Sequence, residues 1–271
     1  MHYCLYATFV LALAACTEKQ PATNTPPALP SPPASPAAPA ALPATAARPD
    51  TAVARQRLTL AQLPAALRPP GQLLEAWRWM DANGENVLVA SRTVATDDDQ
   101  ADDGRTARLL VRQHARPAGS TEAYRQLWQL QDAVSDCPLD LTLGLLPGST
   151  RITDLDGNGR TETTLVYALG CRGGVDPAAL KLIMREGAAK YALRGEALQL
   201  VGGPAEMARA QRVAAGPVCC AEGIPDTAYQ RLEGLYVTEK DFVNAPLVFL
   251  KFAQQQWRRW RTRADQGTEV P

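Results

Sequence analysis

The stretch that decides the fold is Asp154-Leu155-Asp156-Gly157-Asn158-Gly159-Arg160-Thr161-Glu162, which leads directly into the apolar segment Thr163–Cys171. Oxygen-bearing side chains occupy its first, third, fifth and ninth positions, and glycines occupy its fourth and sixth. Ca²⁺ takes roughly six to eight oxygen ligands at about 2.3–2.6 Å, and a tightly turned loop supplies several from alternate residues. Glycines let such a loop curl, because they adopt positive φ without a Cβ clash. The expected ligands are the side chains of Asp154, Asp156, Asn158 and Glu162 and the carbonyl of Arg160.

This loop resembles the calcium loop of integrin-type FG-GAP repeats, whose pattern is D-x-D-G-D-G-x-x-D. Asn158 and Glu162 each replace an aspartate of that pattern. One carboxylate fewer predicts weak affinity, with a Kd on the order of 10⁻⁴–10⁻³ M. An EF-hand is excluded, because its twelfth position is a bidentate Glu and is Leu165 here. A propeller is excluded because the motif occurs once. The alternative is a metal-free turn rich in Asx and Gly; the sequence favours a structural ion.

Short segments of strand-forming residues, separated by turn signals, continue on both sides of the loop. They predict a mainly β fold, antiparallel and meander- or sandwich-like, with α+β as the alternative. The expected strands are Leu73–Met80, Asn86–Arg92, Thr106–His114, Tyr124–Asp132, Leu139–Leu145, Thr163–Cys171, Lys181–Met184 and Tyr191–Arg194. A helix is expected near the C-terminus, because apolar residues recur there at three- and four-residue steps. These residues are Leu250, Ala253, Trp257, Trp260 and Ala264.

The first fifteen residues, MHYCLYATFVLALAA, contain no Lys, Arg, Asp or Glu. This run is too short to span a bilayer, which takes about 20 apolar residues, and is typical of a secretory signal peptide. It ends in Leu13-Ala14-Ala15-Cys16, which resembles the lipobox of bacterial lipoproteins. The resemblance implies that residues 1–15 are removed and that Cys16 becomes the lipidated N-terminus, with diacylglycerol and an N-acyl chain such as palmitate. Several acyl chains anchor a protein stably where one alone is marginal. A plain signal peptide with a coincidental cysteine is the alternative.

The domain organisation follows from a change in composition after the signal. Pro21–Asp50 has ten prolines among thirty residues, and most of the others are Ala, Ser or Thr. Such a segment has almost nothing to bury and stays extended. We therefore expect a disordered tether over residues 16–55, one globular β-rich domain over 56–265, and a disordered tail over 266–271. The residue after Cys16 is Thr17 and not Asp. In this respect the sequence resembles lipoproteins that are sorted to an outer membrane. The expected location is therefore the bacterial cell envelope, in the outer membrane, facing the periplasm or the surface.

The balance of charge and the absence of catalytic motifs exclude several classes of function. The chain has 28 basic and 28 acidic residues, and this balance argues against nucleic acid as a partner. His114 is the only histidine after the signal, so it cannot build a zinc site alone, and no G-x-S-x-G motif is present. No catalytic residue is predicted. The alternative is a glycan-active hydrolase or transferase that uses Asp132 or Asp136 beside Glu162, which would require acids about 5–9.5 Å apart.

Four cysteines remain in the expected globular domain, and an even number in an exported protein indicates disulfides. They allow three connectivities. Cys137–Cys171 is the favoured pair, because both residues flank the strands that enclose the ion loop. That choice leaves Cys219 and Cys220, which would bridge Cα atoms about 3.8 Å apart, shorter than the usual minimum of about 4.4 Å. The state of this second pair stays open.

A further set of residues lies between Trp77 and Gly195. It comprises Arg112-Gln113, Tyr124, Leu127-Trp128, Asp136-Cys137, Asp154-Leu155-Asp156-Gly157, Tyr167, Cys171, Lys181-Leu182-Ile183-Met184, Lys190-Tyr191 and Arg194-Gly195. Together these residues resemble a family of uncharacterised exported bacterial proteins, loosely labelled with surface-polysaccharide biosynthesis. The resemblance implies an envelope location and one shared domain, but no reaction. The predicted function is a membrane-tethered envelope lipoprotein with a calcium- and disulfide-stabilised β domain. It would bind an envelope protein or a glycan, and its only predicted membrane contact is the lipid anchor.

Overall fold

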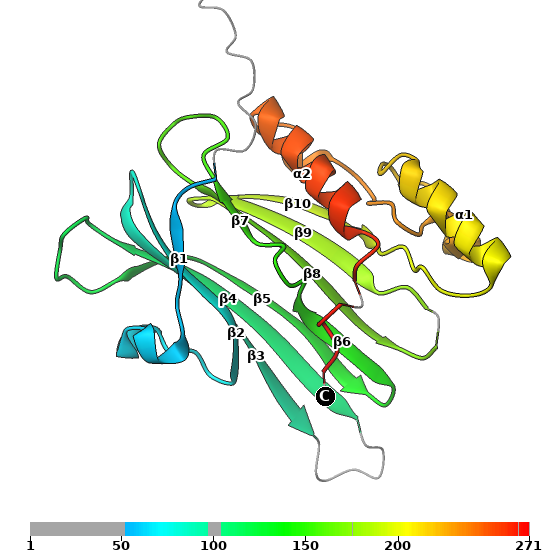
Figure 1. Cartoon of the computed structure of the whole chain (residues 1–271), viewed down its shortest axis with the longest axis horizontal. Helices are drawn as coiled ribbons and strands as arrows, with labels where there is room; N and C mark the ends of the chain where they lie inside the picture. Colours follow the sequence, from blue (N-terminus) through cyan, green and yellow to red (C-terminus); the bar gives the residue numbers. More distant parts are fainter. Residues whose placement is uncertain (1–51, 97–103, 175, 265, 271) are drawn as a thin grey trace, which may run out of the picture. The chain divides into compact units, whose positions relative to one another are not determined.

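Two antiparallel β-sheets pack face to face, and helices cover the far side of the second sheet (Figure 1). The computed structural model describes residues 52–96, 104–174, 176–264 and 266–270, all of which fall within the unit Thr45–Pro271. The first sheet has the order β1-β2-β3-β4-β5; the second has the order β10-β9-β8-β6, with β7 also paired to β8. The predicted mainly β, antiparallel fold is confirmed. The strands are β1 (Arg55–Arg57), β2 (Gln72–Asp81), β3 (Gly84–Thr96), β4 (Arg105–Arg116), β5 (Arg125–Cys137), β6 (Asp140–Leu145), β7 (Arg151–Thr153), β8 (Glu162–Arg172), β9 (Ala179–Glu186) and β10 (Ala189–Glu196).

Strand β8 is the centre of the fold, because both of its faces are buried. Leu165 and Tyr167 pack into the core between the two sheets. The alternate residues Val166 and Ala168 pack on the opposite face, against the helical layer. This follows from the two-residue period of a strand, which sends successive side chains to opposite faces. A strand buried on both faces has little freedom to shift, so the loop that precedes it begins from a fixed position.

Two helices cover the second sheet. The predicted C-terminal helix is α2 (Leu247–Trp260), and its Phe249 and Trp257 are fully buried. The helix α1 (Pro204–Ala215) was not predicted, although Pro at its first position and Gly216 at its end are ordinary helix boundaries. Within the described residues, no helix combines the length and the apolar character needed to cross a membrane.

A short N-terminal segment covers the outer face of the first sheet. It contains two single 3-10 turns, η1 (Leu60–Gln62) and η2 (Ala65–Leu67). Its Leu58, Leu63 and Leu67 pack on apolar residues of β2 and β3. This small third core explains why the globular composition begins well before the first long strand.

The structure corrects the expected domain boundaries at both ends. The tether was expected to run through residue 55, but Ala52 pairs with Thr153 and the backbone N–H of Val53 donates to Ile152 at 3.2 Å. The C-terminal tail was expected to be disordered, but the N–H of Val270 donates to the carbonyl of Leu141 at 2.9 Å and its side chain is buried. Both segments gain order because they add backbone hydrogen bonds to exposed strand edges. The expected signal peptide, Cys16 and the expected tether up to residue 51 lie outside the described residues.

A disulfide joins the two sheets at one end. Cys137 at the end of β5 is bonded to Cys171 in β8, with Cα atoms 5.4 Å apart, which is within the usual range for disulfides. This is the pairing that the sequence favours. The bridge closes a span of 34 residues that includes β6, β7 and the candidate calcium loop. In the chain-entropy model a closure of this length stabilises the fold by about 4 kcal/mol.

Candidate metal centre

The candidate calcium loop joins β7 to β8 as the end of a β-hairpin. Thr153 and Glu162 are the last paired residues, so residues 154–161 form the loop itself. Gly157 and Gly159 have φ of 74° and 82°, values that favour glycine. The backbone N–H of Gly159 donates to Asp154 Oδ2 at 3.1 Å, and that of Asn158 donates to Asp156 Oδ1 at 3.2 Å. These bonds curl the chain as the sequence pattern predicted.

Three of the predicted ligands converge. One carboxylate oxygen each from Asp154, Asp156 and Glu162 lies within 4.8 Å of the others. Two oxygens bound to the same Ca²⁺ at about 2.3–2.6 Å can be at most about 5 Å apart. The three groups therefore lie close enough to share one ion without a change in the path of the backbone.

Glu162 has the environment of a group that needs a counter-ion. Its side chain is fully buried, and its Oε2 accepts hydrogen bonds from Thr153 Oγ1 and from the N–H of Leu155, both at 2.9 Å. Its Oε1 is equally buried but has no hydrogen-bond partner in the described part of the chain. Burial, and to a smaller extent the negative charge of Asp156, raises the pKa of Glu162 to about 7. A buried carboxylate is costly unless a cation or donors compensate it, and a Ca²⁺ bound by the cluster would compensate the charge of this side chain.

The two remaining predicted ligands, the side chain of Asn158 and the carbonyl of Arg160, are not among the converging carboxylates. The side chain of Asn158 is exposed, and its Oδ1 accepts from the N–H of Arg160 at 2.7 Å. Its Nδ2 donates to Asp156 Oδ2 at 3.0 Å. The side chain of Asn158 therefore stabilises the turn through hydrogen bonds within the loop. The N–H of Thr161 points to Asp81, so the Arg160 carbonyl of the same planar peptide points away from Asp81.

A polar network attaches the loop to the first sheet, and sequence reasoning missed it. Asp81, at the end of β2, accepts from the N–H of Thr161 at 3.2 Å and from its hydroxyl at 2.7 Å. The indole N–H of Trp79 donates to the same hydroxyl at 2.9 Å. Asp81 also accepts from Asn86 Nδ2 at 2.7 Å, while Gln113 links Asn86 to Thr163 through bonds of 3.0 Å. The sequence Asp-Ala-Asn-Gly at residues 81–84 is typical of a turn, but nothing in the sequence indicates that Asp81 contacts the loop.

The carboxylates of the enzyme alternative do not come together. Asp132 Oδ2 accepts from Tyr167 Oη at 2.9 Å and from Lys181 Nζ at 2.5 Å, in the space between the sheets. Glu162 lies five residues before Tyr167 on β8 and on the opposite face, which is about 16 Å along the strand. Asp136 is farther away, because it adjoins Cys137 at the disulfide end of β8. None of these separations matches the spacing required of a glycosidase acid pair.

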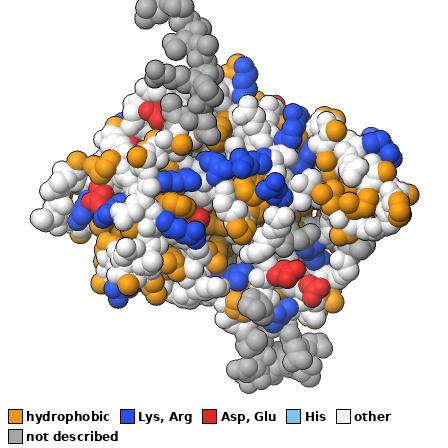
Figure 2. All heavy atoms as spheres, in the orientation of Figure 1, with side chains coloured by type: hydrophobic (Ala, Val, Ile, Leu, Met, Phe, Trp, Pro, Cys, Tyr) orange, Lys and Arg blue, Asp and Glu red, His pale blue; other side chains and the backbone are white. Residues whose placement is uncertain are grey.

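Basic side chains gather on one face of the molecule. Figure 2 shows a band of Lys and Arg side chains across the middle of the face that it draws. Separately, strands β9 and β10 carry Lys181, Arg185, Lys190 and Arg194; of these, Lys181 pairs with Asp132 and Arg194 with Asp241. Partial burial, followed by the repulsion of Arg194 and Arg185, lowers the pKa of Lys190. Lys190 is therefore close enough to Arg194 and Arg185 for their charges to act on it.

The comparisons with known proteins give no relative from which a role could be transferred. No protein-family model matches the chain, and neither a curated protein nor a solved structure matches it. The fold and the site together define a two-sheet β domain with a hairpin loop of converging carboxylates.

Proposed function

We propose that this protein is a lipid-anchored protein of the bacterial cell envelope whose β domain is stabilised by Ca²⁺ and by a disulfide and serves as a binding module. The observation that carries the calcium proposal is the fully buried Glu162. Its Oε1 has no hydrogen-bond partner among the described residues, and one of its carboxylate oxygens lies in the cluster with Asp154 and Asp156. The lipobox at Leu13–Cys16 supports the anchor.

The ion has a structural role in this proposal. Glu162 belongs to the residue pair of the β7–β8 hairpin that adjoins the loop, and the next residues of β8 form the centre of both cores. An ion held by Glu162 and the loop would fix the entry into that strand. Because only three carboxylates converge, we expect a Kd on the order of 10⁻⁴–10⁻³ M, which suits an extracytoplasmic compartment.

The proposed partner is an envelope protein or a glycan that carries anionic groups. The exposed Lys190 of β10 favours such a partner, because it lies near two further cations, Arg185 and Arg194, of which Arg194 also pairs with Asp241. An anionic group of the ligand would pair with Lys190. Exposed charges of this kind contribute more to the rate and specificity of association than to raw affinity.

A calorimetric calcium titration of the full chain tests the ion. One site should appear, and Asp156→Ala should remove it because the substitution deletes a carboxylate and leaves both glycines in place. Asp176→Ala is the matched control, since this exposed aspartate is not part of the cluster. Mg²⁺ should bind more weakly, because it demands stricter octahedral geometry. Calcium binding that persists in Asp156→Ala would contradict the proposed site.

Membrane fractionation tests the anchor separately. Cys16→Ser should move the protein out of the detergent phase, or leave it unprocessed, because no acyl chain can be attached. Cys4→Ser is the matched control and should partition like the unchanged protein. Detergent-phase partitioning that survives Cys16→Ser would rule out lipidation at this residue.

A further inference from the structure

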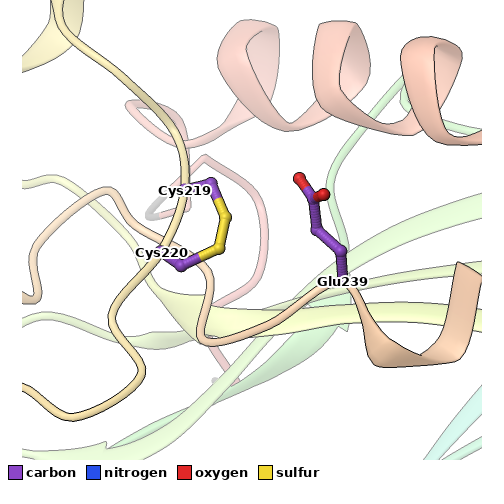
Figure 3. A group of neighbouring side chains, drawn as sticks. All are labelled: Cys219, Cys220 and Glu239. Carbon is purple, nitrogen blue, oxygen red and sulfur yellow. A yellow bond between two sulfur atoms is a disulfide. The ribbon is translucent and has the colours of Figure 1, made fainter. Parts of the chain in front are cut away.

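A second cluster of donor atoms lies apart from the calcium loop. Cys219 and Cys220 are bonded to each other, and Figure 3 shows their sulfur atoms and the carboxylate of Glu239 facing the same space. One potential ligand atom from each of the three residues lies within 4.8 Å of the others. The calcium proposal uses none of these groups.

Backbone pairing fixes where this cluster lies. The N–H of Tyr236 donates to Val218 at 3.0 Å, and the N–H of Ala221 donates to Tyr236 at 2.9 Å. The two segments therefore run side by side, and the bond from the N–H of Val237 to Arg194 at 2.8 Å attaches them to β10. The cysteines and Glu239 are thus held together as an extension of the second sheet.

Two side chains orient the carboxylate of Glu239. Tyr236 Oη donates to Glu239 Oε1 at 2.5 Å, and Gln254 Nε2 from α2 donates to the same oxygen at 2.7 Å. Burial, together with the hydrogen bond to Glu239, raises the pKa of Tyr236, so its phenol remains a donor. Hydrogen bonds of this kind are the usual supports of metal-binding side chains.

Two basic side chains border the cavity that Cys219 lines. Lys251 and Arg258 line the same cavity as Cys219, which has a volume of about 490 Å³. Nearby lysine and arginine side chains lower the pKa of a thiol. Two thiolates and a carboxylate would place three negative charges around one cation, and these two basic residues would offset the excess.

We propose that Cys219, Cys220 and Glu239 form a binding site for a thiophilic divalent cation of the Zn²⁺ or Cd²⁺ class, available only when the two cysteines are reduced. Thiolate sulfur with carboxylate oxygen suits such cations, and three protein ligands leave a fourth position open. An external dithiol breaks the Cys219–Cys220 bond by giving two electrons and two protons, and is itself oxidised to a disulfide. Binding of the cation then releases the two thiol protons.

A cadmium titration of the reduced full chain tests this proposal. Cys4→Ser and Cys16→Ser should be present in every sample, so that only the cysteines of the described residues can respond. One equivalent of Cd²⁺ should produce the ultraviolet charge-transfer band of cadmium thiolates. The oxidised protein should show no such band. Circular dichroism of the reduced sample would establish that it is still folded.

Variants assign the ligands. Cys219→Ser/Cys220→Ser should abolish the band, which separates this site from any reduction of Cys137–Cys171. Glu239→Gln should weaken Cd²⁺ binding at least tenfold, since even residues that only orient a ligand contribute about 10–100-fold. Glu222→Gln is the matched control, because Glu222 is an exposed neighbour that pairs with Lys240, and it should leave the affinity unchanged. No band in the reduced protein, a band that survives the double serine variant, or an unchanged affinity in Glu239→Gln would overturn the proposal.

Discussion

The β7–β8 loop and the Cys219–Cys220–Glu239 cluster gather potential ligands in different ways. The loop takes its three carboxylates from nine consecutive residues and offers only oxygen. The cysteine cluster joins two segments that the sheet brings together, and it offers two sulfurs and one oxygen. The first set matches a hard cation and the second a thiophilic one. The comparison shows that one domain can hold two donor sets with different chemistry, of which only the local one is visible in the sequence.

The two cysteine pairs should differ most in their contribution to stability. Cys137→Ser/Cys171→Ser should lower the free energy of unfolding by about 4 kcal/mol, because it opens a closed span of 34 residues. Cys219→Ser/Cys220→Ser should lower it by less than about 1 kcal/mol, because adjacent residues close almost no loop. Urea unfolding of the two double variants measures both values. Equal losses of unfolding free energy in the two double variants would show that Cys219–Cys220 is a structural bridge like Cys137–Cys171.

Asp81→Ala should sharpen the comparison by uncoupling the loop from the first sheet. It removes the acceptor of Thr161, Asn83 and Asn86, and unsatisfied buried donors cost about 1–3 kcal/mol each. We expect a loss of about 3–4 kcal/mol in urea unfolding, together with weaker calcium binding. Cadmium binding by the reduced cysteines should not change. Asp176→Ala is again the control and should stay within about 0.5 kcal/mol of the unchanged protein. Calcium affinity that is indifferent to Asp81→Ala would show that the loop does not depend on this network.

The calcium-free protein should lose stability as the pH rises. The pKa of Glu162 is raised from 4.5 to about 7 in the folded protein, so the folded state binds this proton more tightly than the unfolded chain. The resulting stabilisation is complete below about pH 4.5 and is lost as the pH rises to about 7, by roughly 3 kcal/mol in all. Saturating calcium should remove this slope because it compensates the ionised carboxylate. Urea unfolding at several pH values, with Glu162→Gln as the control without this titration, measures the effect. An equal slope in Glu162→Gln would assign it to another group.

Sequence reasoning succeeded where the determinants were local. The alternating segments predicted the long strands, and the apolar steps in Leu247–Trp260 predicted α2. The spacing also placed Asp154, Asp156 and Glu162 together, because residues in one short turn must lie close together; their binding of an ion stays a prediction. It missed contacts that depend on strand pairing. The bond between Asp81 and Thr161 spans 80 residues, and Glu239 reaches the cysteines only through the backbone pairing of Tyr236. The helix α1 was missed although its boundary residues were present, because its amphipathic pattern is weak and only Ala210 is buried.

Thermal unfolding across a calcium titration tests the central claim most directly. If the loop holds Ca²⁺, calcium at ten times its Kd should stabilise the folded full chain by about 1.4 kcal/mol. For a domain of this size that corresponds to a rise in melting temperature of about 3–5 °C. Asp156→Ala should abolish the rise, and Asp176→Ala should retain it. The wild-type protein should first be freed of bound calcium with a chelator. If added calcium, up to millimolar concentrations, then leaves its melting temperature unchanged, the β7–β8 loop is only a turn.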